Sequence, residues 1–208
     1  GAIGRLLAVE CLWAMRKHDT YYEADWRRTP PSGGPALINL VHDIDLMRFL
    51  CGDIVRLSAE GGAIAREHAV EDTLAIHVRF ASGAVGTVLA SDAAPSPWGW
   101  ELGTGENPAI PQTGRNCYRL MGTTGSLALP RLELWRHGNV TPAHWHHPIT
   151  VETLAEGARA SLCEQLRYFC SVARGETKPR VDAEDGLQTL RSVLAIHESL
   201  AQCRAITL

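Results

Sequence analysis

The sequence predicts an α+β fold in which helices cover one face of a largely antiparallel sheet. Residues 73–80 (TLAIHVRF) alternate between apolar and polar side chains, which is the period of a strand with one buried face. Further short strand-like segments follow through the middle of the chain, and two segments with helical periodicity close it. This order of strand, helix, several strands and two helices is typical of the α+β class.

The first part of the chain is expected to form a strand and then a helix. Residues 5–15 are rich in apolar side chains and favour a strand. The sequence TPPSGG at residues 29–34 is a cluster of breaker residues that ends one element and precedes the next. A helix is predicted at residues 35–50, because Pro35 suits a first helical turn and Gly52 suits a helix end.

The middle of the chain is expected to be a run of strands. The turn sequence ASGA joins the strand at residues 73–80 to a return strand at residues 85–90. Further strands are predicted at residues 55–63, 116–121, 126–129 and 132–137. Residues 92–114 are rich in proline, glycine and tryptophan and are predicted to form a long loop, which in a compact domain is commonly functional.

Two helices and a short strand, at residues 205–208, are expected to close the chain. An apolar stripe at helical spacing contains Leu162, Leu166, Phe169, Cys170 and Ala173. Asp182 is the expected N-cap of the last helix, and Asp185 resembles the second member of a capping box. One face of that helix carries Leu187, Leu190, Leu194, His197 and Ala201.

Composition excludes several classes of partner. Hydrophobic residues make up 45% of the 208 residues, charged residues 21%, and the net charge is −3, so neither nucleic acid nor an anionic membrane surface is an expected partner. No stretch approaches the roughly 20 apolar residues of a membrane span. The six cysteines form no C-x-x-C pair and predict reduced, mostly buried thiols in a cytoplasmic protein; a secreted protein with three disulfides is the alternative. The first residues lack both a signal peptide and an initiator methionine, which predicts a piece of a longer gene product.

Polar side chains interrupt the apolar body of the helix predicted at residues 35–50. His42 and Asp45 are i, i+3 neighbours, and Asn39 lies one turn before His42. A carboxylate beside an imidazole orients the ring and favours its protonated form, and such a histidine can exchange a proton with a hydroxyl group near neutral pH. The alternative is a polar network that fixes the helix to the sheet.

Three further motifs have ordinary structural explanations. The sequence HWHH (residues 144–147) lacks a nearby cysteine or carboxylate to complete a metal site, so a surface loop is predicted and no metal. The sequence GTTGSL (residues 122–127) lies between strands, lacks G-x-G-x-x-G and predicts a hairpin turn. The two indoles of SPWGWE (residues 96–101) either stack on a sugar ring or anchor the loop.

Taken together, the motifs resemble the C-terminal domain of the glucose–fructose oxidoreductase, inositol dehydrogenase and rhizopine-catabolism family of NAD(P)-dependent sugar and polyol dehydrogenases. The matching stretches are GAIGRL, KHDTYYEADWR, GGPALINLVHDIDLMRFLCGDI, EDTLAIHVRFASGAVGT, YRLMGTTGSLAL, EQLRYFCSVARGETKPRVDAEDGLQTL and AIHESL. The resemblance implies a large open sheet, with residues 1–208 as one substrate-binding and oligomerisation domain. A Rossmann domain upstream would hold NAD or NADP and a catalytic lysine, so this chain alone is expected to be inactive.

The resemblance also assigns roles to residues. His42 would be catalytic and lie near the substrate hydroxyl, while Asn39, Asp45, Trp26 and Arg27 would position the substrate. Where several relatives carry an aspartate four residues before the histidine, this chain has Ile38. A sugar or polyol is the expected substrate, and a homodimer or homotetramer through the sheet face the expected assembly. The alternatives are a non-catalytic sensor or regulator of the same fold and a stand-alone interaction module.

Overall fold

The computed structural model describes residues 1–138, 140, 142–154 and 160–208. The strands are β1 (Leu6–Ala14), β2 (Ile54–Gly62), β3 (Thr73–Phe80), β4 (Val85–Ser91), β5 (Tyr118–Gly122), β6 (Ser126–Leu129), β7 (Glu133–Arg136), β8 (Thr150–Thr153) and β9 (Ile206–Thr207). The helices are α1 (Pro35–Ile38), α2 (Leu40–Cys51), α3 (Trp100–Thr104), α4 (Ser161–Ala173) and α5 (Ala183–Gln202). Two short 3-10 helices, η1 (Asp19–Glu23) and η2 (Asp25–Arg27), lie between β1 and α1.

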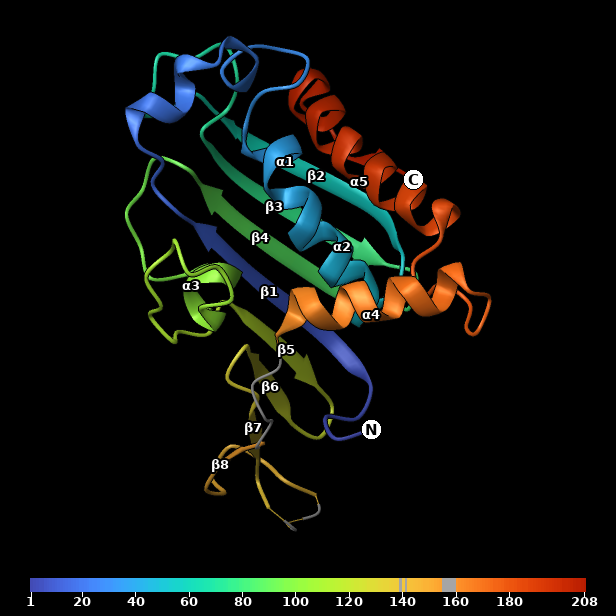
Figure 1. Ribbon diagram of the computed structural model, residues 1–208. Coiled ribbons are helices and arrows are strands. Elements are labelled where there is room, and N and C mark those ends of the chain that lie inside the picture. Colours follow the sequence, from blue (N-terminus) through green and yellow to red (C-terminus); the bar gives the residue numbers. More distant parts are fainter. Residues whose placement is uncertain (139, 141, 155–159) are drawn as a thin grey trace.

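All nine strands belong to one sheet, in the order β8-β7-β6-β5-β1-β4-β3-β2-β9. Among the described strands, β1 and β4 pair in parallel and every other neighbouring pair is antiparallel. The first strand of the chain therefore lies in the middle of the sheet, between β4 and β5. Figure 1 shows α1, α2 and α5 on one face of the sheet, so the predicted α+β class is confirmed.

The strand β3 shows how the sequence pattern sets the two faces of the sheet. Leu74, Ile76, Val78 and Phe80 are buried in the hydrophobic core, whereas Ala75, His77 and Arg79 are exposed. Burial of each large apolar side chain contributes about 1.5–3 kcal/mol, which fixes the register of the strand. The predicted alternation is confirmed, and none of the described helices covers the opposite face of the sheet.

The helix predicted at residues 35–50 is two helices, which meet at Asn39. The amide of Asn39 donates to the carbonyl of Pro35 (3.0 Å), but the amide of His42 donates to the carbonyl of Asn39 (3.1 Å). The second bond spans three residues, as in a 3-10 turn, and this tighter turn separates α1 from α2. Pro35 in the first turn and Gly52 at the end, with φ of 91°, are as the sequence predicts.

The apolar stripes of the last two helices face away from the core. On α4, Leu162 is 74% exposed and Phe169 is 65% exposed, and on α5 the leucines at 187, 190 and 194 are also exposed. The helix α5 instead buries small and β-branched side chains, among them Val193, Ile196 and Ser199. The hydroxyl of Ser199 accepts a hydrogen bond from the amide of Ala59 in β2 (2.9 Å), so small residues allow this helix to approach the sheet edge closely.

Several local predictions are refined by the structure. Asp182 caps α5 by accepting from the amide of Asp185 (3.0 Å), but the carboxylate of Asp185 turns to Arg48 and completes no capping box. The helix α3 lies inside the predicted loop 92–114, and β8 was not predicted. The hairpin turn between β5 and β6 and the short final strand are confirmed.

All six cysteines are free, and the three predicted disulfides of the alternative are not formed. Only half of them are buried, namely Cys11, Cys51 and Cys117, so the prediction of mostly buried thiols is wrong. Cys163 is exposed on the surface of α4, and Cys203 is exposed in the turn that ends α5.

The sequence HWHH lies in an exposed loop between β7 and β8, as predicted, with Trp145 88% exposed. Among the described residues, no three or more histidine, cysteine or carboxylate side chains gather as metal ligands would. No described helix combines the length and the apolar character that a membrane crossing needs.

Candidate functional site

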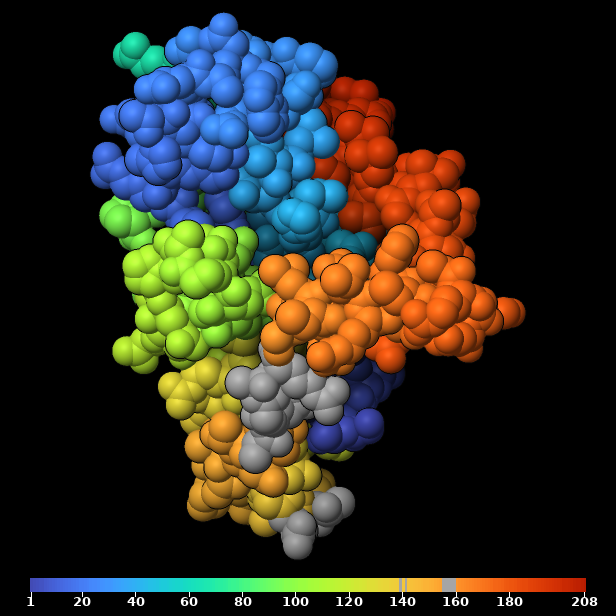
Figure 2. All heavy atoms as spheres, in the orientation of Figure 1, coloured from blue at the N-terminus to red at the C-terminus, as the bar shows by residue number. Residues whose placement is uncertain are grey.

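A cavity of about 390 Å³ lies between the start of α2 and the segment around α3. Figure 2 shows these two segments side by side on the helical face, the first in light blue and the second in green. The cavity is lined by Asn39, His42, Asp43, Leu46, Trp100, Glu101, Glu106 and Tyr118. A larger hollow, of about 570 Å³, lies over β1, β3 and β4 on the uncovered face of the sheet and contains neither Asn39 nor His42.

The structure brings Asn39 and His42 together in this cavity. Asn39 stands at the junction of α1 and α2, and its Oδ1 accepts a hydrogen bond from Nζ of Lys17 (2.9 Å). His42, in the first turn of α2, is exposed, and its ring makes no hydrogen bond to any described residue. The imidazole is therefore free to contact a ligand, and the amide beside it is already oriented.

Asp43 is a cavity residue that the sequence analysis missed. Its carboxyl group is buried, with 4% of the residue exposed. Its Oδ1 accepts from the hydroxyl of Tyr118 in β5 and from the thiol of Cys11 in β1 (3.7 Å). Burial raises the pKa of Asp43 to about 7; the nearby charge of Glu101 also raises it, and the two hydrogen bonds offset only part of the shift.

Asp45 does not line the cavity, and its carboxylate is bonded to α5 and not to the predicted neighbour His42. Its Oδ1 accepts from the hydroxyl of Thr189 in α5 (2.7 Å), and the same hydroxyl accepts from Arg48 (2.6 Å). The i, i+3 spacing places the two residues near each other along α2, but Asp45 lies on the side packed against α5. Asp45 and Arg48 thus join the helices, and Asp43 fixes α2 to the sheet.

Trp26 and Arg27 lie on η2, outside the cavity lining. The guanidinium carbon of Arg27 lies 4.2 Å from the ring centre of Tyr21, and Nζ of Lys17 lies 4.0 Å from the same centre. Since Lys17 also bonds Asn39, a continuous set of contacts leads from Arg27 to the cavity. Trp26 is 50% exposed and extends this surface outward.

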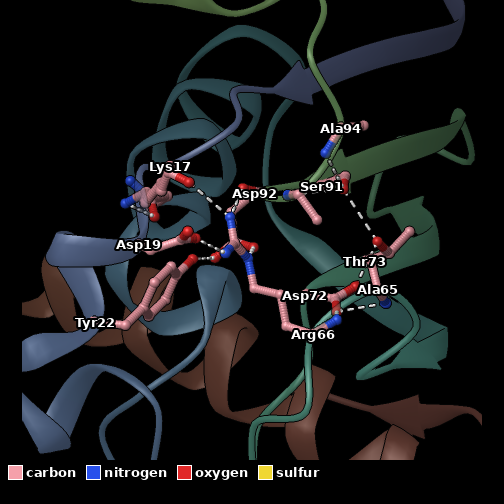
Figure 3. Close-up of polar contacts among 12 residues, drawn as sticks. Lys17, Asp19, Tyr22, Ala65, Arg66, Asp72, Thr73, Ser91, Asp92 and Ala94 are labelled. Carbon is pink, nitrogen blue, oxygen red and sulfur yellow. Dashed lines mark hydrogen bonds and ion pairs between the residues drawn. The ribbon is translucent and has the colours of Figure 1, made fainter.

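A buried polar cluster holds this segment in place. Figure 3 shows the guanidinium group of Arg66 beside the carbonyl of Lys17 and the side chains of Tyr22 and Asp92. Arg66 donates to the carbonyls of Lys17 (2.7 Å) and Asp92 (3.0 Å), and the hydroxyl of Tyr22 donates to Asp92. The hydrogen bond from Arg66 therefore fixes the backbone of Lys17, and this keeps the Lys17 side chain directed at Tyr21 and Asn39.

Of the two indoles in the segment around α3, Trp100 lines the cavity and Trp98 does not. Trp100 packs edge-to-face on Tyr118, with ring centres 6.1 Å apart, so it anchors the segment over the cavity. Trp98 is 41% exposed and borders a hollow on the uncovered sheet face.

Residues 1–128, which include all of the cavity lining, match the C-terminal domain of the GFO/IDH/MocA proteins. The chain belongs to this family. It is 30% identical over 173 residues to D-apiose dehydrogenase from Paraburkholderia graminis, a match that covers 81% of this chain and 43% of that protein. The GFO/IDH/MocA chain described here therefore spans less than half of this relative.

Solved structures share the fold at low sequence identity. An oxidoreductase from Agrobacterium radiobacter, in complex with NAD+, L-tartaric acid and magnesium, is 19% identical with a TM-score of 0.71, over 100% of this chain and 58% of that chain. The WlbA dehydrogenase from Bordetella pertussis, in complex with NADH and UDP-GlcNAcA, is 21% identical with a TM-score of 0.67, over 99% of this chain and 56% of that chain. These similarities establish the fold of the GFO/IDH/MocA C-terminal domain.

Proposed function

We propose that this chain is the substrate-binding and oligomerisation domain of an NAD(P)-dependent dehydrogenase that acts on a sugar, a polyol or a sugar-derived alcohol. The observation that carries the proposal is the meeting of Asn39 and His42 in one cavity, with the ring of His42 unpaired among the described residues. The sugar dehydrogenase among its relatives and the NAD+ and NADH of the solved structures support the same activity.

The nicotinamide cofactor would be held by a domain outside these 208 residues. The sequence contains no G-x-G-x-x-G segment, and α2 follows another helix and not a strand, so the start of α2 does not have the form of a dinucleotide phosphate site. When bound, the nicotinamide supplies the acceptor or donor of a hydride. The cavity described here would supply the opposite wall of the cleft, which holds the substrate.

In this proposal His42 handles the proton of the reacting hydroxyl. A ring nitrogen of the imidazole can accept that proton as the alcohol is oxidised and return it in the reverse direction. Asn39 cannot act as a base, but its amide donates to a hydroxyl oxygen while Lys17 holds its carbonyl oxygen. Trp26 and Arg27 would bind substrate groups that extend outward from the cavity.

The full-length gene product should oxidise a neutral sugar or polyol with NAD+ or NADP+. The test follows nicotinamide absorbance with a panel of neutral sugars and polyols, and this 208-residue chain serves as the control that should show no turnover. If no turnover is seen with saturating cofactor and with every substrate of the panel at saturation, the proposal of a dehydrogenase is contradicted. It would favour the non-catalytic sensor of the same fold, since a sensor needs only binding.

The uncovered face of the sheet would be covered by a second copy of the chain. Its centre carries exposed apolar side chains on adjacent strands, namely Leu7, Val85, Leu89 and Met121. A glutamate in place of Leu89, which is 52% exposed there, should shift light scattering from an oligomer to a monomer. Ile64→Glu, on an exposed loop, is the matched control and should leave the oligomer intact; a Leu89→Glu protein that stays oligomeric would exclude this face.

A further inference from the structure

The cavity lining includes the carboxyl group of Asp43, which residues of β1 and β5 hold in position. Asp43 lies at the start of α2 and is almost fully buried, yet it borders the cavity. Tyr118 and Cys11 both donate to its Oδ1. Its second oxygen, Oδ2, has no hydrogen-bond partner among the described residues. Oδ2 is not one of the fully buried side-chain atoms without a partner, so it remains accessible, and a ligand hydroxyl in the cavity can donate a hydrogen bond to it.

The charges around the cavity disfavour an anionic ligand. Glu101 and Glu106 line the same space as Asp43, and the lining contains no lysine or arginine among the described residues. Lys17, which contacts the lining residue Asn39, is engaged with that amide and with the ring of Tyr21. A carboxylate or phosphate on the ligand would therefore meet acidic groups, whereas neutral hydroxyl groups can donate hydrogen bonds to them.

The shape and the walls of the cavity suit a small polyhydroxylated molecule. Its volume of about 390 Å³ lies near the lower end of the range of small-molecule sites, roughly 300–1,000 Å³. Trp100 and Leu46 supply apolar surface to the lining, against which the C–H face of a sugar ring can pack.

We propose that Asp43 binds a substrate hydroxyl through Oδ2 and that the acidic cavity thereby selects a neutral sugar or polyol over its acid analogue. This inference rests on the proposed function, because it places the substrate in the cavity of Asn39 and His42. Tyr118 is a positioning residue in this arrangement: it holds Oδ1, so that Oδ2 faces the ligand. The sequence pattern alone identified neither Asp43 nor Tyr118 as a residue that binds or positions the ligand.

Direct binding tests the proposal independently of turnover. Calorimetry with the full-length protein, saturated with cofactor, compares D-glucose, D-apiose and myo-inositol with D-glucuronate, the acid that matches glucose. At least one neutral ligand should bind, and glucuronate should bind at least tenfold more weakly than glucose. Asp43→Ala should weaken binding of the neutral ligand by about 10- to 100-fold, and Asp43→Asn, whose amide still pairs with a hydroxyl, should restore most of it.

A structural role alone would not change the selectivity. In both Asp43 variants the preference for glucose over glucuronate should fall by about tenfold, and Asp72→Asn, a buried carboxyl outside the cavity, should keep the wild-type preference. Wild-type protein that binds no neutral ligand or prefers glucuronate, or Asp43 variants with unchanged affinity and preference, would overturn the inference. Neutral ligands bound through Asp43 without turnover would contradict the dehydrogenase and leave this inference standing.

Discussion

Replacing His42 by alanine should lower the kcat of the full-length protein by about 10²- to 10⁴-fold, the range for loss of a general acid–base group. The free energy of unfolding should change by less than about 0.5 kcal/mol, because the ring is exposed and makes no hydrogen bond to a described residue. Steady-state kinetics and denaturant unfolding on the same preparation separate the two effects.

A second histidine provides the control. His146 lies in the exposed loop between β7 and β8, and His146→Ala should change neither kcat nor stability. A near-normal kcat in His42→Ala would remove the proton-transfer role. The alternative from the sequence, a polar network that fixes the helix to the sheet, predicts a loss of stability in His42→Ala instead. In the structure, however, it is Asp43 and not His42 that makes side-chain hydrogen bonds to the sheet.

The second large effect concerns the stability of the protein as a function of pH. The pKa of Asp43 rises from 3.8 to about 7 on folding, so the folded state holds its proton more tightly than the unfolded state. Stability from this group is fully present below the unfolded pKa and is lost as the pH rises through 7. Between pH 4 and pH 8 the loss amounts to about 4 kcal/mol.

Asparagine at position 43 keeps an acceptor for Tyr118 and Cys11 but cannot ionise. Asp43→Asn should therefore match the wild type in stability near pH 4 and exceed it by up to about 4 kcal/mol at pH 8, as measured by urea unfolding across the range. Parallel pH profiles for the two proteins would contradict the buried, proton-binding state of Asp43.

Asp72 supplies a comparison of opposite sign. Burial raises the pKa of its carboxyl, but bonds from Thr73 and from the amides of Ala65 and Arg66 outweigh this and leave the pKa lowered. Its stabilisation is present above the unfolded pKa and is lost as the pH falls. Asp72→Asn should hence be less stable than the wild type at neutral pH, where Asp43→Asn is more stable.

The sheet was predictable because each strand carries its own pattern. The alternation in β3 and the turn into β4 depend on adjacent residues alone, and both are as the sequence predicts. The outward direction of the stripes on α4 and α5 was not predictable, because a helical period shows that a face exists and not which neighbour covers it. On α5 the residues that approach the sheet are Val193, Ile196 and Ser199, and the leucine stripe does not show that this other face is the buried one.

The candidate site was predictable only in part. Asn39 and His42 stand out because polar residues interrupt an apolar segment, and both line the cavity. Asp43 has the same appearance in the sequence as Asp45, and only the positions of Tyr118 and Thr189 distinguish a group at the cavity from a group between helices. Those partners come from distant parts of the chain, so no local spacing reveals them.

The central place of β1 also constrains the order in which the protein can fold. Its two neighbours, β4 and β5, are made only after α1, α2, β2 and β3, so the first strand has no partner in the sheet until β4 (Val85–Ser91) exists. Joining it to the sheet closes long loops, whose entropy cost slows folding. During synthesis the apolar face of β1, with Val9, Cys11 and Trp13, stays unpaired, and this is the period in which a nascent chain is most exposed to aggregation.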